Sequence, residues 1–342
     1  MERDKAGRPL RQAGFRRVAI VGVGLMGGSV ALAVRRARPH TIVVGVDSSE
    51  AVVQEALDRR IVHEGSTGIA AVAGADLVIL AAPVLQNLAL LRDVACHVPG
   101  DAVVTDLGST KRAIVEAARV EAPRMTFVGG HPIAGGSAGG LAAARPDLFM
   151  GRKWVLTPCD VTANLTMSRL FAFIAALGGI PCTMTAAEHD RLLAVVSHLP
   201  HFAASALMHV VGEVAGEEGL AVSGAGLAHA TRIASSPPGI WKDVLATNSD
   251  NIRPALLRLI AALAELAGGL VGDPADGPAA DVAKGWSTGR AAGPAVGPGD
   301  IGLGGRATGS ALGVEAVERI FVSARKWRER IDSAGPGGGG RS

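Results

Sequence analysis

The chain has 342 residues, of which 48% are apolar, 19% charged and 3% aromatic, and its formal net charge is +3. This length allows two domains with a large buried core. The small charge and the lack of a basic run interleaved with aromatic residues exclude a typical nucleic-acid-binding protein. The three cysteines are far apart and lack CxxC spacing. They therefore argue against a disulfide framework or zinc knuckle and fit the cytoplasm.

The first residues resemble a targeting signal only superficially. Residues 1–16 are polar and basic, which predicts a disordered N-terminus. Arg16 to Val34 combines a basic start with an apolar run, as a signal peptide or membrane anchor does. Four closely set glycines weaken its helix propensity, and another strand-like run begins a few residues later. We therefore expect neither export nor a membrane partner.

Strand and helix patterns then alternate up to residue 160. Apolar, β-branched runs predict strands at 17–24, 41–47, 75–83, 101–109 and 125–132, with 153–159 as a further candidate. The intervening segments have helical character and about a dozen residues each. This order is typical of βαβ units and predicts the α/β class, with a Rossmann-type, doubly wound parallel sheet over residues 17–160.

The pattern becomes helical after this sheet. Residues 161–271 together with 311–332 predict an all-α domain whose long apolar helices suggest a subunit interface. The segment 272–310 is rich in Gly, Pro and Ala and is expected to be a disordered insertion. A glycine-rich tail, 333–342, is also expected to be disordered.

A glycine fingerprint lies where the first strand gives way to a helix. Gly22-x-Gly24-x-x-Gly27 permits a tight turn, close approach of a pyrophosphate to the backbone and close helix–strand packing. Asp47 ends the second strand, where a carboxylate accepts ribose hydrogen bonds and repels a 2′-phosphate, so NAD is favoured over NADP. A glycine turn with no ligand is the alternative. The residues predicted to bind the cofactor are Gly22, Gly24, Leu25, Met26, Gly27, Asp47, Pro83 and Ser109.

Two further segments reach the same edge of the predicted sheet. In "VVTDLGSTK" a strand ends at Asp106 and a helix follows Ser109, and by itself this pattern is most simply a helix cap. In "VGGHPIAGG" the next strand ends at His131. A neutral imidazole there can accept a proton from a substrate hydroxyl near pH 7, although a structural histidine is the commoner reading of such a position.

Several motifs occur together in a fixed order. They are "VAIVGVGLMGGSVALAV", "VTDLGSTK", "GGHPIAGG", "AAEHDRLLAVVSHLPH" and "TRIASSPPGIW". In this order the chain resembles the TyrA family, the prephenate and arogenate dehydrogenases of tyrosine biosynthesis. The resemblance covers about 17–270 and the last helix, and "GGHPIAG" with "SHLPH" is its most specific part.

The resemblance implies a homodimeric, NAD-dependent enzyme that oxidises and decarboxylates a small cyclohexadienol. It implies that His131 removes the hydroxyl proton at C4 while hydride passes to the nicotinamide, and that Ser109 hydrogen-bonds the histidine and the reacting hydroxyl. Arg232 would hold a substrate carboxylate through its two-pronged donor geometry. The other residues implied near the substrate are His201, Ser197 and Trp241. The small residues after His131 would let ring and nicotinamide meet face to face.

The chain departs from many relatives at two positions. Ser137 and His229 stand where an acidic residue is frequent near the substrate's side chain. Fewer carboxylates disfavour the ammonium of arogenate, so prephenate is the expected substrate. The alternatives are an arogenate or dual-specificity cyclohexadienyl dehydrogenase, a β-hydroxyacid dehydrogenase and a non-catalytic NAD-binding regulator. The β-hydroxyacid enzymes need a lysine in the region where this chain has "SHLPH".

The helical histidines also allow a metal-site reading. His198 with His201, or His189 with Asp190, could be taken for ligands. No HExxH motif is present, and Pro200 suggests a helix start rather than a ligand pair. No metal is therefore expected.

Overall fold

The computed structural model describes residues 14–98, 100–135, 139–159, 162–270 and 319–326. The predicted insertion 272–310, the tail 333–342, most of the N-terminal segment and Ser137 lie outside these residues. The described chain forms two compact units. One contains the residues up to His201 together with Arg232–Asn251, and the other contains Phe202–Thr231 and the residues from Ile252 onward.

The first unit is built on one eight-stranded sheet, which confirms the predicted doubly wound architecture. Its order is β3-β2-β1-β4-β5-β6-β7-β8. The strands are β1 (Arg17–Val21), β2 (Ile42–Val46), β3 (Glu64–Ser66), β4 (Leu77–Leu80), β5 (Val103–Asp106), β6 (Thr126–Pro132), β7 (Lys153–Thr157) and β8 (Ile180–Thr183). Neighbouring strands are parallel except β6 and β7, which are antiparallel.

Two strands were not predicted. β3 has three residues, "EGS", and β8 reads "IPCT", so neither contains an apolar, β-branched run. β8 continues the sheet beyond residue 160, where the predicted nucleotide-binding domain ended. Both are edge strands, and edge strands carry a weaker hydrophobic signature because only one neighbour covers them.

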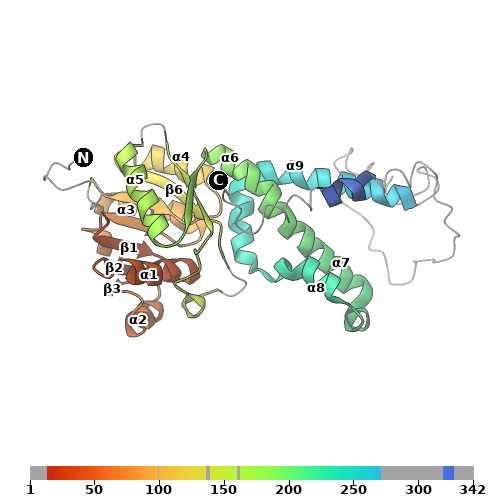
Figure 1. The fold of residues 1–342 in the computed structure, drawn as a ribbon, viewed down its shortest axis with the longest axis horizontal. Helices are drawn as coiled ribbons and strands as arrows, with labels where there is room; N and C mark the ends of the chain where they lie inside the picture. Colours follow the sequence, from red (N-terminus) through yellow and green to blue (C-terminus); the bar gives the residue numbers. More distant parts are fainter. Residues whose placement is uncertain (1–13, 99, 136–138, 160–161, 271–318, 327–342) are drawn as a thin grey trace, which may run out of the picture. The chain divides into compact units, whose positions relative to one another are not determined.

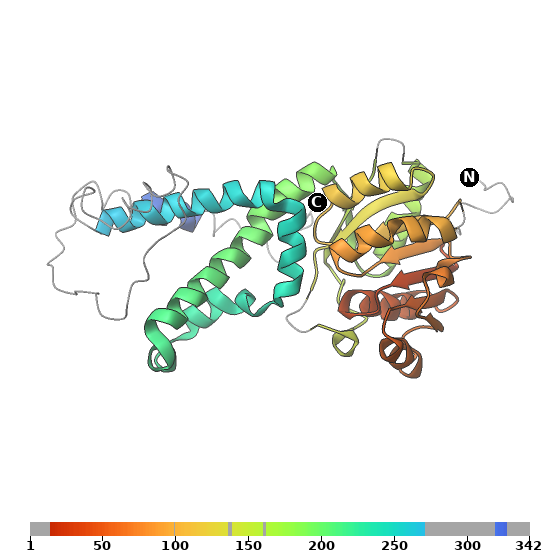
Figure 2. The ribbon, with the colours of Figure 1, turned by 180° about the vertical axis from the view of Figure 1, so that it is seen from behind.

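Helices cover both faces of the sheet. They are α1 (Leu25–Ala37), α2 (Glu50–Asp58), α3 (Val84–His97), α4 (Arg112–Glu121), α5 (Asn164–Ala176) and α6 (Ala186–Leu193). Successive side chains of β1 alternate between two core clusters, as a strand's period of two requires: Ile20 packs with α1 and α5, and Val21 with α3 and α4. Figure 1 shows α1 and α5 on one face, and Figure 2 shows α3 and α4 on the other.

The sheet order creates a topological switch point between β1 and β4. These strands are parallel neighbours, and the chain leaves them for helices on opposite faces, α1 and α3. In such sheets the carboxyl ends at the switch point form a crevice that binds ligands. Gly22 follows β1 and Ala81 follows β4, so both lie at this edge.

The described residues of the second unit are helical apart from the short connection at 222–224, and a helical domain was predicted in this part of the chain. It takes in most of α7 (Leu199–Ala221), all of α8 (Ala225–Thr231) and the later part of α9 (Pro238–Leu270). Residues 319–326 are also helical, and an ion pair between Arg319 and Glu265 ties them to α9.

One continuous helix in the described chain is long and apolar enough to cross a membrane. It runs from Ala186 to Ala221, and only 17% of its most apolar window is buried. Length and composition alone are weak grounds for a span, because an apolar helix can equally be covered by protein. Exposed Leu207, Val210 and Val214 belong to this helix.

Candidate active site

The three glycines of the fingerprint have three different roles. Gly22 has φ +95°, and a Cβ there would lie 2.6 Å from the amide nitrogen of Ala82. A Cβ on Gly27 would lie 2.0 Å from the carbonyl oxygen of Gly22, so this glycine allows α1 to pack against β1. A Cβ on Gly24 would meet nothing within 4 Å. Gly24 therefore leaves open space for a ligand to approach the backbone.

The N-terminus of α1 faces this open space. Gly24 is the N-cap, and within the described chain no side chain caps the helix. Its first amides therefore have no partner within the helix and carry the positive end of the helix dipole, which suits an anion. Asp47 lies close by, accepting hydrogen bonds from the amides of Val23 (2.9 Å) and Ser49 (3.0 Å). Each carboxylate oxygen keeps a lone pair for a further donor.

Two adjoining cavities follow this edge, with volumes of about 560 Å³ and about 410 Å³. Both are within the range of sites for cofactors and drug-sized ligands. They share the lining residues Gly24, Ala81, Ala82 and Pro83. The larger is also lined by Gly22 and Asp47, and the smaller by Leu25, Met26, Ser109 and His131. Every predicted cofactor residue except the tightly packed Gly27 thus borders one continuous groove.

His131 is the second-last residue of β6 and faces the smaller cavity. Its Nδ1 lies 2.8 Å from Nε2 of His189. Burial lowers the pKa of His131 well below its ordinary value, and the nearby His189, Lys111 and His198 lower it further. The imidazole is therefore neutral at pH 7, the form that can accept a proton.

Ser109 lines the same cavity, as predicted, but the implied hydrogen bond to His131 is not present. Within the described chain the Nδ1 partner of His131 is His189 instead. The small residues after His131 do border the cavity: a Cβ on Gly135 or Gly139 would meet nothing within 4 Å.

A buried ion pair lies behind His131. Lys111 and Asp106 are both fully buried, and the ammonium donates to the Asp106 carboxylate and to the carbonyl of Gly130 (2.8 Å). Burial lowers the pKa of Lys111, and Asp106 opposes this effect. A Cβ on Gly130 would lie 2.5 Å from the backbone oxygen of Asp106, and one on Gly129 would lie 3.3 Å from Cδ of Lys111, so these glycines leave space for the end of β5 and for the Lys111 side chain.

The helix-cap interpretation of Asp106 and Ser109 is wrong. Asp106 accepts hydrogen bonds from the amides of Gly108 (2.8 Å) and Gly130 (2.9 Å), and α4 begins only at Arg112. The cap comes from Asp190, 79 residues beyond Lys111. Its carboxylate accepts the amides of Lys111 (2.7 Å) and Arg112 (2.9 Å). In the sequence, Asp190 stood out only as the acidic residue next to a histidine in "EHD". Its position along the chain did not indicate that it caps α4.

The residues implied to surround the substrate lie partly together. The rings of His201 and Trp241 have centroids 4.1 Å apart. Nδ1 of His201 lies 3.2 Å from the backbone oxygen of Ser197. Arg232 is exposed and is not among the residues lining either cavity. In the described part of the chain its guanidinium has no hydrogen-bond or ion-pair partner.

Two further observations concern charge at the site. Asp243 lines the smaller cavity and accepts the amide of Leu85 (3.1 Å) in the first turn of α3, a carboxylate that the sequence analysis did not single out. No group of three or more His, Cys, Asp or Glu side chains in the described ranges is arranged to hold a metal ion. The sequence suggested a helix start at Pro200, and α7 begins one residue earlier, at Leu199. A π-helical turn that contains His198 directly precedes it.

Comparisons with known proteins point to the same family along most of the chain. The family descriptions "Prephenate dehydrogenase, nucleotide-binding domain" and "Prephenate dehydrogenase, dimerization domain" match residues 30–180 and 185–276. Prephenate dehydrogenase of Bacillus subtilis is 35% identical over 240 residues, which are 69% of this chain and 65% of that enzyme. Cyclohexadienyl dehydrogenase of Zymomonas mobilis is 32% identical over 259 residues, which are 74% of this chain and 87% of that enzyme.

A solved structure matches as well. The crystal structure of prephenate dehydrogenase from A. aeolicus, in complex with hydroxyphenyl propionate and NAD+, superposes with a TM-score of 0.73 at 28% identity. The match covers 94% of this chain and 100% of that one.

Proposed function

We propose that this chain, which belongs to the prephenate dehydrogenase (TyrA) family, catalyses the NAD-dependent oxidative decarboxylation of prephenate to 4-hydroxyphenylpyruvate and CO2. The observation that carries the proposal is the position of His131. This neutral imidazole lies on the wall of a cavity that continues to the glycine turn and to Asp47. A base and a dinucleotide groove in one site suit a dehydrogenase acting on a hydroxyl.

The residues of the groove fit NAD. The open approach at Gly24 and the uncapped amides of α1 would hold the pyrophosphate, and Asp47 would accept hydrogen bonds from the adenosine ribose. Its negative charge disfavours the 2′-phosphate of NADP. Leu25, Met26, Pro83 and Ser109 would border the nicotinamide, which supplies the hydride acceptor when the cofactor is bound.

His131 would act twice in the reaction. It first accepts the C4 hydroxyl proton at Nε2 while C4 loses its hydride and becomes a carbonyl carbon. The C1–carboxylate bond then breaks, CO2 leaves, and its electron pair passes through the ring to the C4 oxygen. That oxygen recovers the proton from His131 and becomes a phenol. Aromatisation makes the step favourable, and the base ends the cycle neutral.

The substrate's carboxylates need a cation. Arg232 would provide it, because its exposed guanidinium is not committed to any described partner and offers two parallel donors. His201, Ser197 and Trp241 would form the wall beside it, a role that their mutual contacts support.

Prephenate is proposed over arogenate on charge. The family resemblance implies that Ser137 and His229 stand where an acid is frequent near the substrate's side chain, and the missing negative charge would weaken attraction for an ammonium. Asp243 is a carboxylate of the cavity, but it already accepts a hydrogen bond from the amide of Leu85. The Zymomonas relative, by its name, makes a cyclohexadienyl enzyme of broader specificity the second candidate.

The first test is NADH formation at 340 nm by the purified chain with NAD and either prephenate or arogenate. We expect turnover of prephenate with the higher kcat/KM. A higher kcat/KM for arogenate would reverse the substrate assignment. Normal NAD binding without turnover of either substrate would instead favour a non-catalytic NAD-binding regulator.

Two glycine variants should separate cofactor binding from folding. Gly24→Ala should leave the free energy of unfolding nearly unchanged, because its methyl group meets no atom, yet weaken NAD binding at the pyrophosphate. Gly27→Ala should destabilise the fold by roughly 1–3 kcal/mol, the usual cost of overpacking. Urea unfolding and fluorescence titration with NAD would measure both. Unchanged NAD affinity in Gly24→Ala would contradict the assigned pyrophosphate site.

We also propose that the chain is a cytoplasmic homodimer. The dimerization-domain match over residues 185–276 supports it, and the exposed apolar side chains of α7 need a cover. Free Cys96, Cys159 and Cys182 fit a reducing compartment. Light scattering should give the mass of two chains without detergent; a monomer, or a need for detergent, would contradict the assignment.

A further inference from the structure

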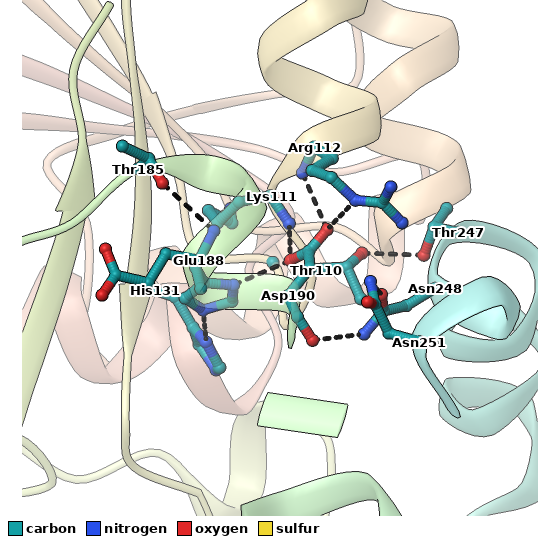
Figure 3. A network of polar contacts seen from close by, with 12 residues as sticks. Thr110, Lys111, Arg112, His131, Thr185, Glu188, Asp190, Thr247, Asn248 and Asn251 are labelled. Atoms are coloured by element: carbon teal, nitrogen blue, oxygen red, sulfur yellow. Dashed lines mark hydrogen bonds and ion pairs between the residues drawn. The ribbon is translucent and has the colours of Figure 1, made fainter. Parts of the chain in front are cut away.

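A chain of three side chains leads from the cavity into the core. Nδ1 of His131 lies 2.8 Å from Nε2 of His189, and Nδ1 of His189 lies 2.8 Å from Oδ1 of Asp190. His189 and Asp190 are both fully buried and begin one turn into α6. Figure 3 labels the two ends of this chain, His131 and Asp190, and shows Asp190 beside Lys111 and Arg112.

Asp190 is held as a carboxylate. Burial alone would raise its pKa, but the hydrogen bond from His189 and the amides of Arg112 and Lys111 outweigh burial and lower the pKa below its ordinary value. The Arg112 guanidinium lies 3.5 Å from Oδ2. An ionised carboxylate only accepts hydrogen bonds, so Nδ1 of His189 must be the donor in the shared contact.

The positions of the other imidazole protons follow from this donor. With its proton on Nδ1, a neutral His189 offers the lone pair of Nε2 to His131, and His131 must donate from Nδ1. The reverse arrangement needs a proton on both nitrogens of His189. That would bury an imidazolium near the Lys111 ammonium, which a dry site disfavours even with Asp190 adjacent.

We propose that His189 and Asp190 are positioning residues that fix the proton of His131 on Nδ1, leaving Nε2 as the lone pair that faces the substrate. The inference rests on the proposed function for its catalytic meaning, but the tautomer itself is a property of the free protein. The two residues act only through His131.

The same contact would stabilise the protonated base. When Nε2 of His131 accepts the hydroxyl proton, the ring becomes a cation whose Nδ1–H already points at His189. That Nδ1–H···Nε2 hydrogen bond holds the ring in place while the substrate proton stays on Nε2 of His131. The phenol oxygen takes this proton back, so no proton is gained or lost over the cycle.

Other titratable groups lie near His131 among the described residues, and Asp243 lines the same cavity. Lys111 and Asp106 form a pair behind it, and His198 lies on the π-helical turn that follows α6. Burial lowers the pKa of His198 to about 4, so this ring is neutral at pH 7. A neutral ring cannot replace the Asp190 carboxylate as the negatively charged partner of His189, nor compete with it.

The direct test is the tautomer of His131 in the wild-type protein without substrate. Long-range 1H–15N NMR of the imidazole rings, with His131 assigned from its missing signals in His131→Asn, reports which nitrogen carries the proton. We expect Nδ1–H on His131. A proton on Nε2 would overturn the inference even if the enzyme turns over prephenate. Nδ1–H in a protein without turnover would leave the inference standing and remove the proposed function.

Kinetics of two His189 variants give a second readout. His189→Leu removes both hydrogen bonds and should lower kcat about 100-fold, as loss of an oriented base does, with NAD affinity and prephenate KM retained. His189→Gln keeps an acceptor near the position of Nε2 and should recover most of kcat. If Leu and Gln lower kcat equally, or if KM changes instead of kcat, His189 has only a packing role.

A matched control uses the same substitution elsewhere in this unit. Nδ1 of His63 accepts the amide of Val43 at 2.9 Å, beside β3 and outside both cavities. His63→Gln should leave kcat and the His131 tautomer unchanged. Urea unfolding of each variant would show that loss of kcat in His189→Leu is not loss of folded protein.

Discussion

Replacing His131 with asparagine is expected to lower kcat by about 10²- to 10⁴-fold, the usual contribution of a general base. The asparagine amide can still donate to Nε2 of His189, so the fold should persist, but the amide oxygen is too weakly basic to take the hydroxyl proton. NADH formation at 340 nm measures the loss, and an NAD titration should show unchanged affinity. The same exchange at the exposed His97, whose Nδ1 lies 2.7 Å from the backbone oxygen of Asp93 in the same helix, should be silent.

The pH profile of the wild type gives an independent check. Burial, His189 and Lys111 hold the pKa of His131 below the ordinary 6.5. The base therefore stays neutral as the pH falls through 6.5, and kcat should decline only at lower pH. An acid limb at or above 6.5 would contradict this assignment of the base.

The second large effect is expected on stability. Lys111→Met should lower the free energy of unfolding by about 3–5 kcal/mol, because it leaves the buried Asp106 carboxylate without its cation. The methionine fills much the same space, so charge rather than volume is tested. Lys111 also binds the carbonyl of Gly130, so β6 should loosen next to His131. Urea unfolding measures the change.

Two further variants serve as controls for this result. Lys111→Met combined with Asp106→Asn removes both charges and should be more stable than Lys111→Met alone. Exposed Lys153 provides the control, since Lys153→Met should change stability by no more than about 0.5 kcal/mol. A loss below about 1 kcal/mol in Lys111→Met would show that the pair is not an important part of the core.

Much of the first unit could be predicted because its signals are local. The alternation of Ile20 and Val21 between two core clusters is a property of any strand covered on both faces. The glycine turn needs only its own backbone to explain Gly22, and Asp47 follows from its place after β2. The edge strands β3 and β8 were missed because their short sequences carry no apolar run to recognise.

Local sequence patterns therefore predicted the sheet and the cofactor groove, and a family resemblance pointed to His131 as the proposed base. The surroundings of His131 depend on tertiary contacts. His189 lies 58 residues from His131 and Asp190 lies 79 residues from Lys111, so no local pattern could pair them. The direction of β7, the cap of α4 and the burial of Lys111 likewise depend on which distant segment packs where. Burial and distance set the proton positions and pKa shifts, and both arise only when the chain folds.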